Sequence, residues 1–310
     1  MMGALAPRGA GASSLPMIMM ASSGTQGRVY LLVLAATLCW PLQEAFGGVL
    51  MRGHHAAQVV ALRYIAHLLL LAIIILPRGG LRAFSTSRIG LQMLRGLCMF
   101  GMPTGFILAK GHAGIGWIWT VFWLMPLMAL GGARVLSERP SSAAWASAVA
   151  APLAAAAIWE AVPMSLAGTA AAVLMGASFA GYVVLSRLLR EEKLFPSLFY
   201  TAVGALLPMS YFAWQVWTPI TSSDVVPILI TGLLSLLILG AFDLAAEAAP
   251  ISTIAPIIPL VLVWEPLLAA VRHARPIFTA DIAGMALIAG AILAFVLRDR
   301  EGSPNRAEVA

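Results

Sequence analysis

The sequence predicts an all-α integral membrane protein with ten transmembrane helices. Of its 310 residues, 61% are hydrophobic and only 10% are charged, against about 25% charged in an ordinary soluble domain. Apolar runs of ~20 residues, long enough to cross ~30 Å of hydrocarbon, recur ten times along the chain. No soluble fold can bury this much apolar surface, so soluble classes are excluded.

The ten predicted spans follow one another with short connections. They are approximately residues 29–51, 57–77, 89–110, 113–135, 142–160, 165–187, 195–217, 226–248, 252–271 and 278–297. Residues 1–27 are rich in Gly, Ala, Ser and Met, so we expect a disordered N-terminal tail there. Residues 299–310 are charged and polar, and we expect a short solvated tail.

The basic residues predict the orientation of the chain. An even number of spans puts both termini on one side of the membrane. With the termini inside, cytoplasmic segments receive 13 of the 19 Lys and Arg residues and outer segments receive 4, while Arg63 and Arg95 fall within spans. Positive residues favour the cytoplasmic side. We therefore expect a bacterial inner membrane protein with cytoplasmic termini, and the net charge of +6 indicates topology and not nucleic-acid binding.

A weak internal echo suggests two repeats. Pro126 is followed by Glu138-Arg139-Pro140 after the fourth span, and Pro266 is followed by Ala274-Arg275-Pro276 after the ninth. Five helices separate the two patterns, and because five is odd the halves would insert with opposite orientation. The sequence thus predicts inverted five-helix repeats at residues 28–160 and 161–298.

Four stretches resemble one family of membrane proteins. They are Leu62-Arg63-Tyr64 in the second span, Arg95-Gly96 in the third, Pro126-Leu127 with Glu138-Arg139-Pro140 in the fourth, and Gly-Met-Ala-Leu-Ile-Ala-Gly at 284–290. In this order among ten spans, they resemble the EamA family of the drug/metabolite transporter superfamily over residues 28–298. The resemblance implies an exporter of small metabolites such as amino acids. The chain departs from the pattern in its second half, where the position that corresponds to Glu138 is occupied by Ala274.

Ionisable side chains inside the spans are the first candidates for function, because each costs ~2.5 to 3.5 kcal/mol on insertion scales. Glu44, Arg63 and Glu265 are expected ~6 Å to the outer side of their helix centres, from a rise of ~1.5 Å per residue. They form either a solute site or an ion pair that holds helices together. Arg95 and Asp243 are expected on the inner side, where a buried ion pair is an ordinary brace.

Aromatic residues accompany the carboxylates. Trp40 shares a helix face with Glu44 at i and i+4, and Trp264 precedes Glu265. An aromatic wall beside a charge suits a zwitterionic or cationic amphipathic solute. Trp117 and Trp119 are more simply explained as anchors at the membrane interface. The predicted substrate-binding residues are Trp40, Glu44, Arg63, Trp123, Tyr182, Trp264 and Glu265.

A second group of residues is expected to shape or gate the bundle. Pro256, Pro259 and Pro266 remove backbone donors from the ninth span, which bends the chain where it lines a cavity or hinge. Gly101 and Gly105 are spaced for close helix packing. The predicted structural and gating residues are Arg95, Pro126, Glu138, Asp243, Pro259 and Pro266.

These features favour a secondary transporter that works by alternating access, with a small solute and membrane lipids as its partners. No nucleophile elbow, P-loop or zinc-binding spacing occurs, so we expect no enzyme, cofactor, metal or nucleic-acid partner. A membrane-embedded lipid-modifying enzyme and a non-transporting scaffold remain the alternatives. Glu44, Glu265 and His67 motivate proton coupling as a further hypothesis. The solute, its direction and a homodimeric state stay open.

Overall fold

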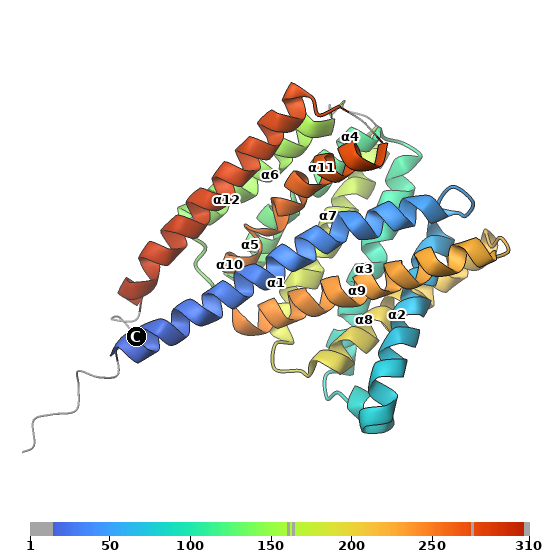
Figure 1. Cartoon of the computed structure of the whole chain (residues 1–310), viewed down its shortest axis with the longest axis horizontal. Helices are drawn as coiled ribbons and strands as arrows, with labels where there is room; N and C mark the ends of the chain where they lie inside the picture. Colours follow the sequence, from blue (N-terminus) through green and yellow to red (C-terminus); the bar gives the residue numbers. More distant parts are fainter. Residues whose placement is uncertain (1–14, 160–161, 163–164, 274–275, 307–310) are drawn as a thin grey trace, which may run out of the picture.

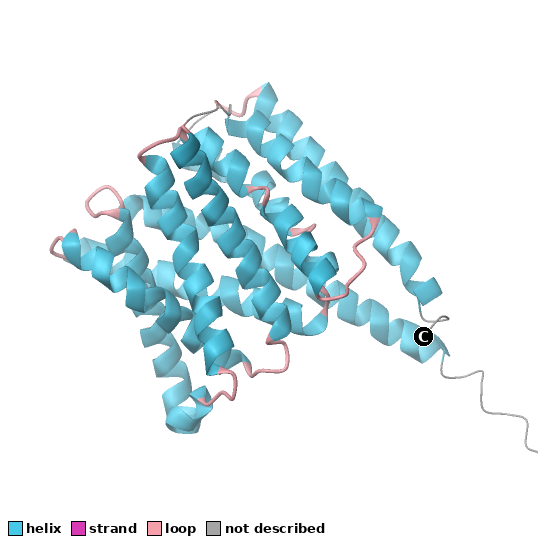
Figure 2. Ribbon diagram, turned by 180° about the vertical axis from the view of Figure 1, so that it is seen from behind, coloured by secondary structure: helices cyan, strands magenta, loops and turns pink. Residues whose placement is uncertain are grey.

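The computed structural model describes residues 15–159, 162, 165–273 and 276–306. In these ranges the chain is a bundle of helices without strands (Figures 1 and 2). Ten of its helical segments are long and apolar enough to cross a membrane. The predicted fold class and the ten predicted spans are therefore confirmed at this level: the protein has the helices of a multi-pass membrane protein.

Eight spans are single helices. They are α1 (Leu15–Leu50), α2 (Ala56–Gly79), α3 (Ile89–Lys110), α6 (Ser142–Trp159), α7 (Leu166–Leu188), α8 (Leu194–Gln215), α9 (Ser222–Ala248) and α12 (Thr279–Arg306). A short helix, η1 (Gly80–Phe84), follows α2. The fourth span consists of α4 (Ile115–Phe122) and α5 (Met125–Val135), and the ninth of α10 (Ile251–Ile254), η2 (Ile258–Leu260) and α11 (Val261–His273).

The boundaries of both tails differ from the prediction. Helix α1 begins at Leu15, inside the tail that we expected to be disordered, because the apolar run from Leu15 to Met20 continues the helix toward the N-terminus. Helix α12 extends to Arg306, inside the predicted C-terminal tail. Residues 1–14 and 307–310 lie outside the described part of the chain.

Proline explains why two spans are interrupted. Pro126 occupies the first turn of α5, where its missing N–H is tolerated. Pro256 and Pro259 interrupt the ninth span between α10 and α11, and the Ser147 hydroxyl of α6 donates to the Pro256 carbonyl at 2.8 Å. A neighbouring helix thus satisfies a carbonyl in the interrupted segment. Pro266, by contrast, lies inside the continuous helix α11.

The most extensive helix pairs join the two halves of the chain. Helix α1 packs along α9, and α3 packs along α7; α1 and α9 lie side by side in Figure 1. At Gly105 an added Cβ would lie 2.7 Å from the Ala171 carbonyl oxygen and the Met175 nitrogen. Gly101 likewise faces Ser178 of α7. The close-packing interpretation of these two glycines is confirmed.

Gly105→Ala is expected to lower the stability of the bundle. The new methyl group meets the backbone of α7, which cannot rotate away as a side chain could, so we expect a loss of about 1–3 kcal/mol. Gly131→Ala is the matched control, because no atom lies within 4 Å of its added Cβ. Thermal unfolding of both detergent-purified variants measures the difference. Equal melting temperatures would contradict the close contact of α3 with α7.

Candidate functional site

Three adjoining cavities lie among the spans, and Glu44 lines all of them. The first cavity, of about 680 Å³, lies between α1, α2, α3 and the start of the fourth span. The second, of about 370 Å³, adds Trp40 and Phe179. The third, of about 330 Å³, reaches Glu265 of α11. The sequence therefore concentrates polar groups around one hollow of the bundle.

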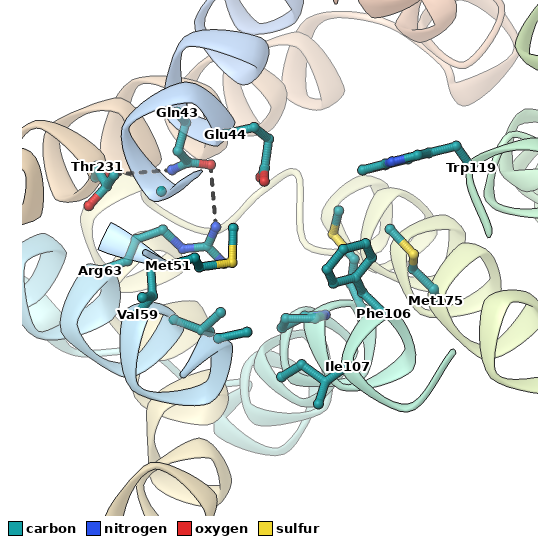
Figure 3. Close-up of a pocket in the computed structure, with 15 residues that line it drawn as sticks. Gln43, Glu44, Met51, Val59, Arg63, Phe106, Ile107, Trp119, Met175 and Thr231 are labelled. Carbon is teal, nitrogen blue, oxygen red and sulfur yellow. Dashed lines mark hydrogen bonds between the residues drawn. The ribbon is translucent and has the colours of Figure 1, made fainter. Parts of the chain in front are cut away.

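Polar residues of α1 and α2 face the first cavity. The amide of Gln43 donates to the Thr231 carbonyl at 3.1 Å, and Arg63 Nη1 donates to Gln43 Oε1 at 3.5 Å (Figure 3). The Arg63 guanidinium also lies over the ring of Tyr64, 5.1 Å from its centroid. Among the described residues Arg63 makes no ion pair with Glu44 or Glu265. The ion pair considered from the sequence is therefore absent, because Gln43 and Tyr64 hold the guanidinium instead.

We call the third cavity the tryptophan cavity; its lining residues are Trp40, Glu44, Trp119, Trp123, Trp159, Val261 and Glu265. The rings of Trp119 and Trp159 stack with their centroids 5.8 Å apart, and the ring centroids of Trp40 and Trp123 are 6.4 Å apart. The two carboxylates have no hydrogen bond or ion pair within the described residues. Among the described residues, no basic group is in direct contact with either acidic group of this aromatic wall; the nearest cations, Arg63 and Arg272, act on them only at longer range.

Two predicted binding residues lie elsewhere. The indole N–H of Trp264 donates to Thr37 Oγ1 at 3.4 Å, and Trp264 lines none of the three cavities. Consecutive helical residues do not share a face, so a cavity-facing Glu265 turns Trp264 away. Tyr182 also lines none of them; its hydroxyl donates to Asp243 Oδ1 at 3.2 Å. Neither residue therefore belongs to the wall of these three cavities.

Trp119 is a further candidate for the site. Trp119 lines the first cavity and the tryptophan cavity, and Figure 3 shows it across the hollow from Glu44. Trp119 and Trp123 are four residues apart and therefore lie on one helix face. This spacing, which is visible in the sequence, indicates that Trp119 faces the same cavity as Trp123. Trp117 instead donates to Thr169 Oγ1 at 2.8 Å. Its indole is held by α7.

The first cavity continues to one end of the bundle. A further hollow is lined by His54, His55 and Lys110 near the loop between α1 and α2, and it shares Met51 and Phe106 with the first cavity. We call this end the mouth. The mouth and the cavity lined by Glu44 therefore adjoin each other.

A buried charge network lies on the other side of the cavities. Asp243 is one turn of α9 beyond Leu239, which lines the second cavity, and farther from the mouth. Its carboxylate pairs with Arg95 Nη1 of α3 at 3.0 Å and accepts from Ser186 Oγ of α7 at 3.1 Å. Arg95 Nη2 donates to the Ser197 carbonyl of α8 at 2.5 Å. The predicted pair is present, and it ties four spans together.

Glu138 forms a second link at the same end. Its carboxylate accepts from the backbone N–H groups of Ile251 at 3.1 Å and Ser252 at 2.9 Å, and it lies 3.7 Å from Arg187 Nε. Arg187 also donates to the Ala246 carbonyl at 2.7 Å. The fourth span is thus tied to α7 and to the start of α10. Ala274, its expected counterpart, lies outside the described residues.

The histidines take part in hydrogen bonds between helices. His67 is fully buried, and its Nδ1 lies 3.1 Å from Ser235 Oγ of α9. Near the mouth, His54 lies 2.6 Å from Thr218 Oγ1 and 3.2 Å from Asp224 Oδ2. In the described part of the chain, no group of three His, Cys, Asp or Glu residues could hold a metal ion.

Comparison with known proteins supports the fold. No family model matches the sequence, and no curated protein is similar to it in sequence. A solved structure, described only as the crystal structure of a protein, has a TM-score of 0.72 with this chain at 18% identity. The match covers 88% of this chain and 98% of that chain. At this identity the likeness shows the ten-helix fold alone, which is that of a helical membrane bundle.

Proposed function

We propose that the chain is a secondary transporter that moves a small solute across a bacterial inner membrane by alternating access. One observation carries the proposal. Two carboxylates that make no hydrogen bond or ion pair with any described residue line a hollow inside the bundle. The hollow adjoins the mouth, and the Arg95–Asp243 network lies on its other side. A site reached from one end and closed toward the other is the arrangement that alternating access requires.

The packing pattern supports two inverted repeats at residues 28–160 and 161–298. Inverted repeats would relate the first, second and third spans (α1, α2 and α3) to the sixth, seventh and eighth (α7, α8 and α9). Under this relation the packed pair α1–α9 corresponds to the pair α7–α3, and α2–α9 corresponds to α8–α3. All four pairs are extensive. The two interrupted spans, the fourth and the ninth, are also exchanged. This agreement favours the EamA-like architecture that the sequence motifs suggest.

Orientation follows from the charge distribution. The excess of basic residues in segments on the side of the termini favours a cytoplasmic location for both termini. The mouth, formed at the loop between α1 and α2, then faces outward. In this proposal the conformation is the outward-facing one, in which an exporter would release a small metabolite. The surrounding lipids contact the exposed apolar side chains of the bundle.

Coupling to protons is part of the proposal. Glu44 and Glu265 have no basic partner in hydrogen-bond or ion-pair contact among the described residues, and a carboxylate in a low-dielectric site can be neutralised by a proton as well as by a solute. Competition between the two for one site would couple their movements. Flux that does not respond to an imposed pH gradient would contradict this coupling.

Counterflow into proteoliposomes tests the function. Vesicles loaded with one member of a panel of amino acids, polyamines, nucleosides and organic cations are diluted into the same labelled compound. A transporter accumulates label in a saturable way, because exchange through one site is faster than leakage. If folded protein gives no accumulation of any compound, the scaffold alternative is favoured.

A further inference from the structure

The charges that line the tryptophan cavity are both negative. Glu44 and Glu265 are its only charged lining residues among those that the structure describes. Arg63 lines the first and second cavities but not this one. Arg272, the other nearby cation, is exposed and donates to the Ala45 carbonyl at 3.1 Å. The cavity therefore presents acidic groups to an occupant without a competing arginine in its wall.

The remaining wall is almost entirely indole. Tryptophan is the best aromatic partner for a cation, which binds over the ring face within about 6 Å. Trp40 and Trp123 are only 5% and 1% exposed, so neither anchors the protein to the membrane surface. The indole N–H of Trp123 has no hydrogen-bond partner among the described residues. A ligand oxygen beside the cationic centre would accept from it.

The geometry points to an organic cation, an amine or quaternary ammonium compound, as the solute that this cavity binds. This inference rests on the proposed transport function and names its substrate class. One carboxylate neutralises the charge of the ligand while the indoles contact its N-alkyl groups. A hard metal ion is a poor occupant, because it prefers six or more oxygen ligands and the cavity offers two carboxylates among rings.

A zwitterion is the competing ligand. Its carboxylate would have to reach Arg63 in the adjoining cavity while its ammonium group lies in the tryptophan cavity. Arg63 Nη1 is hydrogen-bonded to Gln43, and the guanidinium lies over Tyr64, although its Nε has no partner among the described residues. Because the tryptophan cavity holds two carboxylates and no arginine, its own wall favours a positive ligand without a carboxylate.

Three probes of similar size separate these alternatives. Choline carries a quaternary ammonium group, 3,3-dimethylbutan-1-ol replaces its nitrogen by carbon, and glycine betaine adds a carboxylate. We expect labelled choline to bind the purified full-length protein and tetraethylammonium to displace it. The uncharged alcohol should compete at least about tenfold more weakly, because it lacks the cation–π and carboxylate attraction.

Matched variants locate the bound cation. Glu265→Gln should weaken choline binding by at least about tenfold, because it removes a carboxylate that pairs with the cation, whereas Glu247→Gln should leave it unchanged, since the Glu247 side chain is exposed on α9. Trp123→Phe keeps an aromatic ring and removes the N–H, so it should weaken the binding of choline more than that of tetraethylammonium, which has no oxygen to accept from the N–H.

Four results would overturn the inference. Equal binding of choline and its uncharged analogue would mean that the cavity recognises shape alone, and stronger binding of glycine betaine would assign a zwitterion. Saturable counterflow of another compound, with no binding of either cation, would reject the cation and leave the transport function standing. Absence of both binding and counterflow in folded protein would reject the transport function as well.

Discussion

Replacing Glu265 with glutamine is expected to abolish transport while the amount of folded protein in the membrane stays unchanged. Glu265 faces the tryptophan cavity and has no hydrogen bond or ion pair with any described residue, so its charge contributes little to holding the helices together. Removing an isolated charge from an apolar site even relieves a desolvation cost. A bound cation that loses this carboxylate should lose at least about 2 kcal/mol of binding free energy, which is about 30-fold in affinity.

The measurement is counterflow of the best solute into proteoliposomes that contain equal amounts of each protein. Glu247→Gln makes the same chemical change on an exposed side chain and should transport like the wild type. Melting temperatures of the three proteins show whether folding is affected. Undiminished counterflow in Glu265→Gln would remove this carboxylate from the transport site.

Replacing Arg95 with alanine is expected to have the largest effect on stability. Arg95 is 1% exposed and contacts Asp243, Ser186 and the Ser197 carbonyl. The substitution leaves the buried Asp243 carboxylate without its cation. Breaking one side of a buried pair costs about 3–5 kcal/mol, so Arg95→Ala should unfold at a markedly lower temperature than the wild type.

A double substitution separates the pair from its surroundings. Asp243→Asn alone should also destabilise the protein, because it leaves the guanidinium unpaired. The combination of Arg95→Met with Asp243→Leu should recover much of the loss, since apolar replacement of both partners is often neutral. Unfolding in mixed micelles gives the free energies. Additive effects of the two sites would contradict direct coupling between Arg95 and Asp243.

The fold was largely predictable from the sequence, because each span is a run of apolar residues long enough to cross a membrane. The ten apolar runs correspond to the ten membrane-length helices of the structure. The tails were less predictable. The apolar run at the start of α1 joins the first span without a breaking residue, and α12 continues into a polar segment. Hydropathy reports the membrane-crossing part of a helix and not its full length.

The candidate site was predictable only where helix periodicity fixes direction. Trp40 and Glu44 share a face and line one cavity, as their spacing predicts. Trp264 does not line the same cavity as Glu265, because consecutive residues of a helix lie on different faces. Trp159 and Gln43 were missed, because nothing local distinguishes a cavity-facing side chain at the end of α6 or beside Glu44. Their roles depend on which helices pack together.

Exchange of access between the two ends of the bundle is the central claim, and thiol labelling tests it most directly. Cys39 and Cys98 are first replaced by serine, and single cysteines are introduced at Ile107 near the mouth and at Ser186 in the Arg95–Asp243 network. Membrane-impermeant reagents are then applied to each side of oriented membranes. We expect Ile107→Cys to react from the outer side, and Ser186→Cys to react slowly from the cytoplasmic side at a rate that changes when solute is added. A Ser186→Cys protein that never reacts from the cytoplasmic side, while solute is present and the protein is folded, would contradict alternating access.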